Sequence, residues 1–113
     1  MATISSLLQR LSRNPKAEAS VKVTAFGFTV GSDVIAWQSV SEIWGYKVDL
    51  LTTDEAFIEF VAAGQNFAVS EVAVGFEALE SAMVAAFPST AAWREVVMHP
   101  AFAANRTLLY RRA

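Results

Sequence analysis

Residues 42–60, "EIWGYKVDLLTTDEAFIEF", alternate apolar and polar side chains on either side of a polar centre. A period of two is typical of β-strands, and Thr and Asp between two such runs favour a turn. We therefore expect a hairpin with residues 52–54 at its tip. The bulky positions of its first strand share one side (Trp44, Tyr46, Val48 and Leu50). We expect Trp44 and Ile58 to face inward together, sealed by a long C-terminal helix.

Charge predicts the register of this hairpin. Antiparallel partners share a face, so we expect paired residue numbers to have an even sum, and two registers of that kind close the turn. One of them puts two acids opposite each other, at a cost of roughly 0.2–1 kcal/mol. The other pairs Lys47 with Glu59 and sets Tyr46 against Phe60. We therefore predict the second register.

The flanking segments predict one α+β domain over residues 1–113. Apolar residues at helical spacing predict a short N-terminal helix within residues 1–15 (Ile4, Leu7, Leu8 and Leu11). Residues 20–74 predict an antiparallel meander of about five or six strands. Residues 75–99 predict helices packed on the sheet, and a cap at Ser89 or Thr90 begins the second of them. We expect residues 100–113 to form a C-terminal tail that lies extended or returns as a short strand.

Composition bounds the class of protein. A chain of 113 residues fits a single domain, and its 54% hydrophobic content exceeds the roughly 45–50% of ordinary soluble domains. The excess suggests that a second subunit covers part of the apolar surface. The chain has no cysteine, which removes disulfides and thiolate chemistry and fits a reducing compartment. With no apolar run long enough for a bilayer and no secretory pattern, we expect a cytoplasmic protein without a transmembrane segment.

Charge is unevenly distributed along the chain. The formal net charge is −2, but residues 31–95 carry ten acids against Lys47 and Arg94. An acidic middle argues against nucleic acid as a partner. A protein partner, either a second copy or another chain, is the expectation that remains.

The residues that carry chemistry are sparse. The single histidine, His99, precedes Pro100 at an expected helix end, where packing or capping is its usual role. One His and no Cys leave only carboxylates for a metal, and no calcium-loop pattern is present. We therefore predict no cofactor and no metal, and the sequence favours a protein without enzyme activity.

The motifs resemble a family of small uncharacterised bacterial proteins. The matching strings read YKxDLLTxD at residues 46–54 and PAFxxNRT at residues 100–107. The run from residue 23 to residue 49 is also similar to bacterial domains of the pleckstrin-homology-like (PH-like) superfold. That resemblance implies a binding or scaffolding module built on a bent sheet or partial barrel with a closing C-terminal helix. Phosphoinositide binding does not carry over, because the first hairpin offers Lys22 alone as a basic residue.

The resemblance also singles out a set of polar residues. They are Tyr46, Lys47, Asp49, Asp54, Glu71, Asn105 and Arg106. One reading is a structural network in which Arg106 pins the tail to the acids. The other is a cleft that contacts a ligand or partner.

Three functions follow from these observations. The first is a non-enzymatic binding module of unknown ligand that self-associates as a homodimer. The second is an antitoxin-like immunity protein that neutralises a basic toxin. The third is a metal- or carboxylate-dependent enzyme that uses Asp49, Asp54 and Glu71, which requires these carboxylates to converge.

Overall fold

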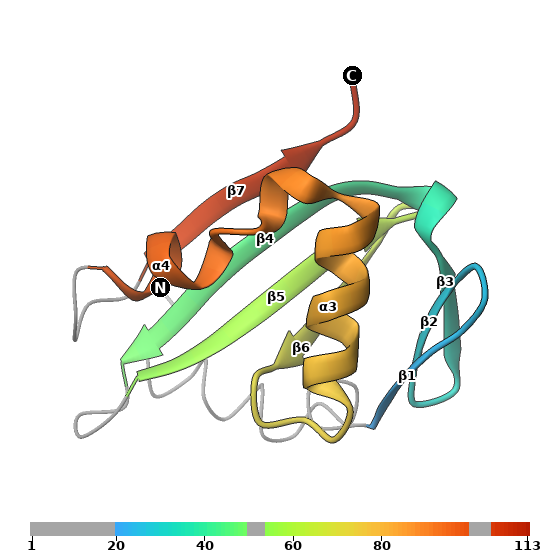
Figure 1. Ribbon diagram of the computed structural model, residues 1–113, viewed down its shortest axis with the longest axis horizontal. Helices are drawn as coiled ribbons and strands as arrows, with labels where there is room; N and C mark the ends of the chain where they lie inside the picture. Colours follow the sequence, from blue (N-terminus) through green and yellow to red (C-terminus); the bar gives the residue numbers. More distant parts are fainter. Residues whose placement is uncertain (1–19, 50–53, 100–104) are drawn as a thin grey trace.

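A computed structural model describes residues 20–49, 54–99 and 105–113 (Figure 1). The strands are β1 (Val21–Val23), β2 (Gly27–Val30), β3 (Asp33–Ala36), β4 (Val40–Asp49), β5 (Asp54–Ala62), β6 (Gln65–Ser70) and β7 (Asn105–Arg111). The helices are α3 (Phe76–Ala86) and α4 (Trp93–Met98), with short 3-10 turns η1 (Trp37–Ser39) and η2 (Pro88–Thr90).

The strands form two antiparallel sheets rather than one meander. A three-stranded sheet has the order β1-β2-β3, and a four-stranded sheet has the order β6-β5-β4-β7. After the two helices the chain returns to the four-stranded sheet as β7. This strand pairs with β4 and places Arg106 opposite Tyr46. Segments some sixty residues apart in sequence thus lie side by side.

The expected α+β class is wrong. Strands dominate the described chain, and its two α-helices have only 11 and 6 residues. Within the described residues no long C-terminal helix closes the sheet, because residues 105–111 return as a strand that pairs with β4. The N-terminal helix expected within residues 1–15 lies outside the described residues.

The expected hairpin register is also wrong. β4 and β5 pair Tyr46 with Phe57 and Lys47 with Ala56, so paired numbers have an odd sum. Paired residues share a face whatever their sum, and a connection with an even number of residues, here 50–53, gives odd sums. In consequence Gly45, not Trp44, shares a face with Ile58.

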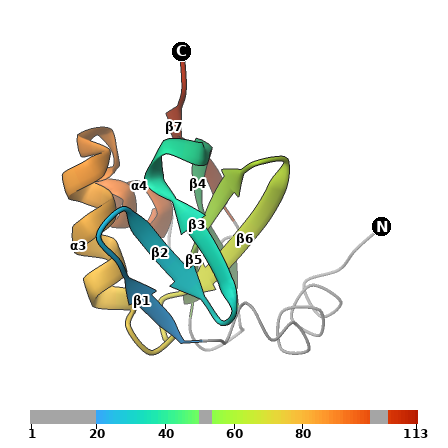
Figure 2. The ribbon, with the colours of Figure 1, turned by 90° about the vertical axis from the view of Figure 1, so that its right-hand side faces the viewer.

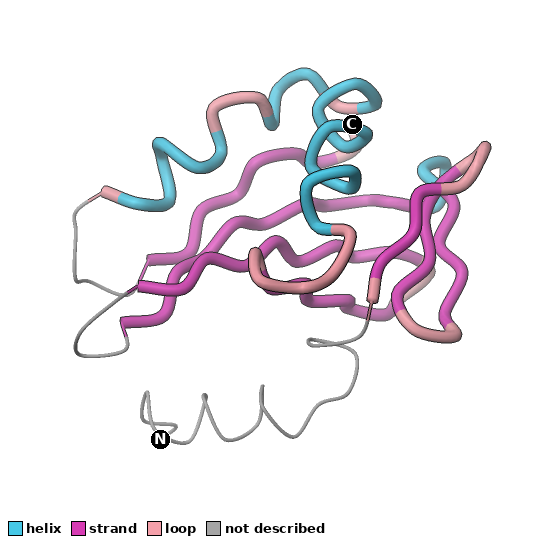
Figure 3. The backbone as a smooth tube through the Cα atoms, turned by 60° about the horizontal axis from the view of Figure 1, so that its bottom comes forward, coloured by secondary structure: helices cyan, strands magenta, loops and turns pink. Residues whose placement is uncertain are grey.

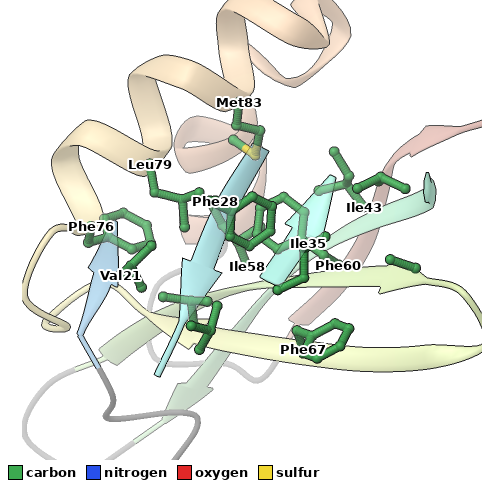
Figure 4. Close-up of a cluster of buried hydrophobic side chains, with 14 of the residues drawn as sticks. Val21, Phe28, Ile35, Ile43, Ile58, Phe60, Phe67, Phe76, Leu79 and Met83 are labelled. Carbon is green, nitrogen blue, oxygen red and sulfur yellow. The ribbon is translucent and has the colours of Figure 1, made fainter. Parts of the chain in front are cut away.

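One face of the four-stranded sheet, here called the inner face, carries the core. Figure 3 shows both helices on this side, and the three-stranded sheet packs over it at one end. The stripe expected on α3 is confirmed, because Phe76, Leu79 and Met83 are all buried there (Figure 4). Phe28 of the small sheet and Phe60 of the large one meet with ring centroids 4.7 Å apart. The two sheets therefore share one hydrophobic core.

α4 sits directly on β4 because β4 has a glycine at the contact. A Cβ built on Gly45 would lie 2.6 Å from Cγ2 of Val97 and 3.1 Å from Cδ1 of Leu109. Trp93, also on α4, is buried beside them. The missing side chain at Gly45 therefore sets how closely the helix approaches the sheet.

The helix caps differ from expectation. Neither Ser89 nor Thr90 caps α4, whose N-cap position is Ala92. The Thr90 hydroxyl instead donates to the carbonyl of Phe87 at 2.7 Å, and the Ser89 hydroxyl donates to that of Leu109 at 3.0 Å. Both hydroxyls thus stabilise the turn between α3 and α4 and its contact with β7.

We predict that Gly45→Ala destabilises the fold by about 1–3 kcal/mol, the usual cost of overpacking a filled contact. The free energy of unfolding in urea measures this change. In the double variant Gly45→Ala/Val97→Ala the lost methyls of Val97 make room for the new one. The destabilisation of Gly45→Ala and that of Val97→Ala, added together, should therefore exceed the destabilisation of the double variant. Additive costs would show that this contact does not determine the position of α4.

Candidate functional site

The opposite face of the four-stranded sheet, here called the outer face, carries aromatic and charged side chains. By the observed register it comprises Glu42, Trp44, Tyr46, Val48, Glu55, Phe57, Glu59, Val61, Ala68, Ser70, Arg106, Leu108 and Arg111. Neither α3 nor α4 lies on this side of the sheet (Figure 3). The outer face is therefore the part of the large sheet where a site can be sought outside the core.

Arg106 organises one end of the outer face. Its guanidinium carbon lies 3.8 Å from the centroid of the Trp44 ring, which is a cation–π arrangement. Its Nη2 atom lies 3.0 Å from Oε1 of Glu59, and about half of the Arg106 side chain is exposed. β7 supplies the arginine, β4 the ring and β5 the acid. The charge of Arg106 is therefore balanced by Glu59, and its guanidinium lies against the Trp44 ring.

Trp44 also holds a second acid. Its indole N–H donates to Oε1 of Glu42 at 2.8 Å. Arg111 approaches the same carboxylate, with its Nε atom 3.3 Å from Oε2. The hydrogen bond from Trp44 lowers the pKa of Glu42, burial works against this, and the charge of Arg111 lowers the pKa further. Glu42 is thereby kept ionised and paired.

The other end of the outer face is apolar. The rings of Tyr46 and Phe57 stack nearly parallel, with an interplanar angle of 9° and centroids 5.1 Å apart. Val48 and Ser70 lie on the same face beside them. Val48, Phe57 and Ser70 are almost fully buried, so little of this end is open to solvent, and the Ser70 hydroxyl donates to Oε2 of Glu55 at 2.6 Å.

Lys47 points the other way, into the protein. Its side chain is buried on the inner face, and Nζ lies 3.3 Å from Oδ2 of Asp54. The ammonium also donates to the carbonyl of Met98 at 3.1 Å, at the last residue of α4. A cation at a helix C-terminus satisfies a carbonyl and suits the helix dipole. Lys47 thus ties the end of α4 to β4 and β5.

Glu71 forms a third, separate group. Its Oε2 atom accepts the backbone N–H of Ala56 at 2.8 Å, and Oε1 accepts from Nη1 of Arg94 at 2.7 Å. Arg94 also lies 3.7 Å from Glu80, whose carboxylate accepts the indole N–H of Trp93 at 2.7 Å. This cluster joins the end of β6 to both helices.

The seven residues singled out from the sequence fall in different places. Tyr46 and Arg106 lie on the outer face, the Lys47–Asp54 pair is buried on the inner face, and Glu71 binds Arg94. Arg106 pairs with Glu59, which the motif did not include. Asp49 and Asn105 end β4 and begin β7, and their side chains lie outside the described residues.

Sequence reasoning missed several partners in these groups, namely Glu42, Trp44, Glu80, Arg94 and Arg111. Glu42 and Trp44 stand two apart on one strand, so a shared face was readable from the sequence. No local signal in the sequence links Arg94 to Glu71 or Arg111 to Glu42. These pairs are 23 and 69 residues apart, and only the folded chain brings them together.

Comparison with family models, curated proteins and solved structures found no match for this chain. The family resemblance therefore stays a prediction that rests on the quoted motifs. Within residues 20–49, 54–99 and 105–113, no His, Asp and Glu side chains form a group that could hold a metal ion. No helix in the described ranges is long and apolar enough to cross a membrane.

We predict that Asp54→Asn destabilises the fold by about 3–5 kcal/mol, because it removes a carboxylate charge that faces the buried Lys47 ammonium. Removing both charges in Lys47→Met/Asp54→Asn should restore part of that loss. Arg106→Gln, which breaks an exposed pair, serves as the contrast and should cost roughly 1 kcal/mol or less. Urea unfolding measures all three. Equal costs for the buried and exposed variants would contradict the assignment of Lys47 to the interior.

We predict that Trp44→Phe raises the pKa of Glu42 toward its ordinary value of 4.5, because the indole N–H is the largest cause of its depression. Carboxyl ¹³C chemical shifts followed against pH measure this. A depressed folded-state pKa gives stability that is present above the unfolded value and is lost as pH falls through the folded value. Arg111→Gln should produce a smaller rise. A pKa that does not move in Trp44→Phe would show that the indole does not hold the carboxylate.

Proposed function

We propose that this protein is a non-enzymatic interaction module that binds a second copy of itself through the surface of the three-stranded sheet. The observation that carries the proposal is the exposure of Phe26, whose side chain is 80% accessible at the turn between β1 and β2. Burying a phenylalanine stabilises a complex by about 1.5–3 kcal/mol. Phenylalanine is also among the residue types that are enriched in the buried cores of protein interfaces.

Three more large apolar side chains are exposed on or beside this sheet. Val34 on β3 is 78% exposed, and Val72 and Val74 are 75% and 76% exposed. The carbonyl of Val74 accepts the N–H of Val21, so the loop that carries both valines runs alongside the start of β1. Figure 2 looks onto this end of the molecule, where β1, β2 and β3 lie beside α3. Such a concentration of exposed apolar groups is typical of an interaction surface.

The edge of this sheet favours a second copy as the partner. Among the described strands, β3 pairs only with β2 and forms an edge of the three-stranded sheet. An antiparallel edge can pair with the same edge of another copy across a two-fold axis. Val34 lies on that edge strand. Self-association would therefore bury apolar side chains and complete backbone hydrogen bonds together.

Enzyme activity receives less support. The acids expected to act together are engaged separately, Asp54 with Lys47 and Glu71 with Arg94 and a backbone N–H. Carboxylates held by their own cations are not arranged to perturb each other as an acid–base pair does. The interaction module is therefore the function we carry forward.

We predict that the wild-type protein has twice the mass of one chain in size-exclusion chromatography with light scattering. Phe26→Ser should weaken self-association by roughly tenfold or more, as truncation of a central aromatic does. Because Phe26 is exposed in the single chain, this variant should keep the unfolding midpoint of the wild type at protein concentrations low enough for both to be monomers. Val96→Thr provides a matched control, since Val96 is a partly exposed apolar residue on α4. A wild-type protein that stays a monomer at high concentration, or an unchanged mass in Phe26→Ser, would overturn the proposal.

A further inference from the structure

β7 gathers positive charge along one edge of the four-stranded sheet. Residues 31–95 carry ten acids, whereas residues 96–113 carry three arginines and no acid. Arg106 and Arg111 lie on β7, and Arg112 follows directly. Among the described strands, β7 pairs with β4 and forms an edge of the sheet, which Figure 1 shows along one margin of the molecule. These arginines therefore line a sheet edge.

Arg106, Leu108 and Arg111 form a row on the outer face of β7. Their partners in β4 are alternate residues of that strand, namely Tyr46, Trp44 and Glu42. The row keeps this spacing because the register shifts at Leu109, which the pairing of β7 with β4 skips. A neighbouring strand would meet such a row with every second side chain. The edge thus presents two cations with an apolar side chain between them.

Both outer-face arginines keep donors for a further carboxylate. Their side chains are 49% exposed in Arg106 and 57% exposed in Arg111. A guanidinium carries five N–H donors. The described ion pair of Arg106 engages its Nη2 atom, and that of Arg111 engages its Nε atom. The remaining donors can bind an incoming acid in the bidentate manner typical of arginine.

The acids already paired with these arginines have other donors as well. Oε2 of Glu59 accepts from Nδ2 of Asn66 at 2.9 Å. Oε1 of Glu42 accepts from the indole N–H of Trp44 at 2.8 Å. Exposed ion pairs contribute little to stability, so sharing an arginine with a second acid costs little. Each carboxylate would keep its neutral donor in that arrangement.

The charge of the row selects the chemistry of a partner. Pairing β7 with β7 of a second copy would bring the same arginines from both copies together, and like charges across paired strands are destabilising. Charged side chains and bulges are devices by which edge strands avoid pairing with each other. Leu108 at the centre of the row favours a protein segment over a nucleic-acid strand, whose backbone carries charge along its whole length.

We propose that β7 binds an extended acidic segment of another protein, which adds a strand to the four-stranded sheet. Two carboxylates of the segment, four residues apart, bind Arg106 and Arg111, and an apolar side chain midway between them packs on Leu108. Backbone pairing supplies affinity and the charges select the partner. This site uses β7, whereas the proposed self-association uses the three-stranded sheet.

A synthetic peptide tests this site. In the probe STETVTETS the two glutamates and the valine share one face of a strand. Fluorescence anisotropy of the labelled probe should show saturable binding. The uncharged peptide STQTVTQTS should bind roughly tenfold more weakly or worse, because it lacks the carboxylates that the arginines bind. In the complex, amide hydrogen exchange should slow in β7 and stay unchanged in β6, at the opposite edge of the described sheet.

Variants assign the binding to the row. Arg106→Gln/Arg111→Gln should weaken binding of STETVTETS by roughly tenfold or more, because both carboxylates lose their partners. Arg94→Gln is the matched control, since the side chain of Arg94 is 45% exposed but lies on α4. In Arg106→Glu/Arg111→Glu the preference should change to the lysine peptide STKTVTKTS. A loss of folding cannot produce such an exchange of preference.

Three results would overturn this proposal. The first is no saturable binding of STETVTETS to the wild-type protein. The second is an equal loss in Arg94→Gln, or slowed exchange in β6 instead of β7, either of which would place the binding elsewhere. The third is a single-stranded oligothymidylate that binds β7 as tightly as the peptide, which would assign the edge to nucleic acid. The light-scattering mass depends on Phe26, so each proposal is decided by its own readout.

Discussion

The pairing of Gly45 with Ile58 is the constraint on which the rest of the structure depends. Because side chains alternate along each strand, this one register assigns every residue of β4 and β5 to a face. It turns Ile43, Gly45 and Lys47 toward the helices and Trp44 and Tyr46 away from them. A slip by one residue would exchange the two sets and bury Trp44 where α4 now packs.

The inner face explains why a glycine and a lysine occupy positions that look exposed in the sequence. Gly45 removes the side chain where Val97 and Trp93 approach the sheet, and Lys47 reaches the carbonyl at the end of α4. Asp54 neutralises that lysine within the protein. A buried ion pair of this kind adds little net stability over an apolar pair, but removing one partner is costly. The pair therefore makes the position of α4 specific.

The predictable part of the fold is the part with local signals. The hairpin of residues 42–60 and the α3 stripe could be read from periodicity, and so could the inward side of β5, where Ala56, Ile58 and Phe60 are buried. Side-chain bulk predicts the wrong inward face for β4, because the packing of α4 requires Gly45 on that face. The pairing of β7 with β4, and hence the contact of Arg106 with Trp44 and Glu59, has no local signal. Such long-range contacts decide which charged residues meet, so the predicted polar group was divided among three places.

Cross-strand NMR contacts test the register most directly. In isotopically labelled protein the account predicts close contacts between backbone protons of Trp44 and Glu59 in β4 and β5, and between those of Trp44 and Leu108 in β7. It also predicts contact between the rings of Tyr46 and Phe57. Backbone contact of Trp44 with Ala62 and of Tyr46 with Phe60 would instead establish the charge-paired register. That result would place Trp44 on the inner face. It would contradict the packing of α4 against Gly45 and the assignment of residues to the inner and outer faces.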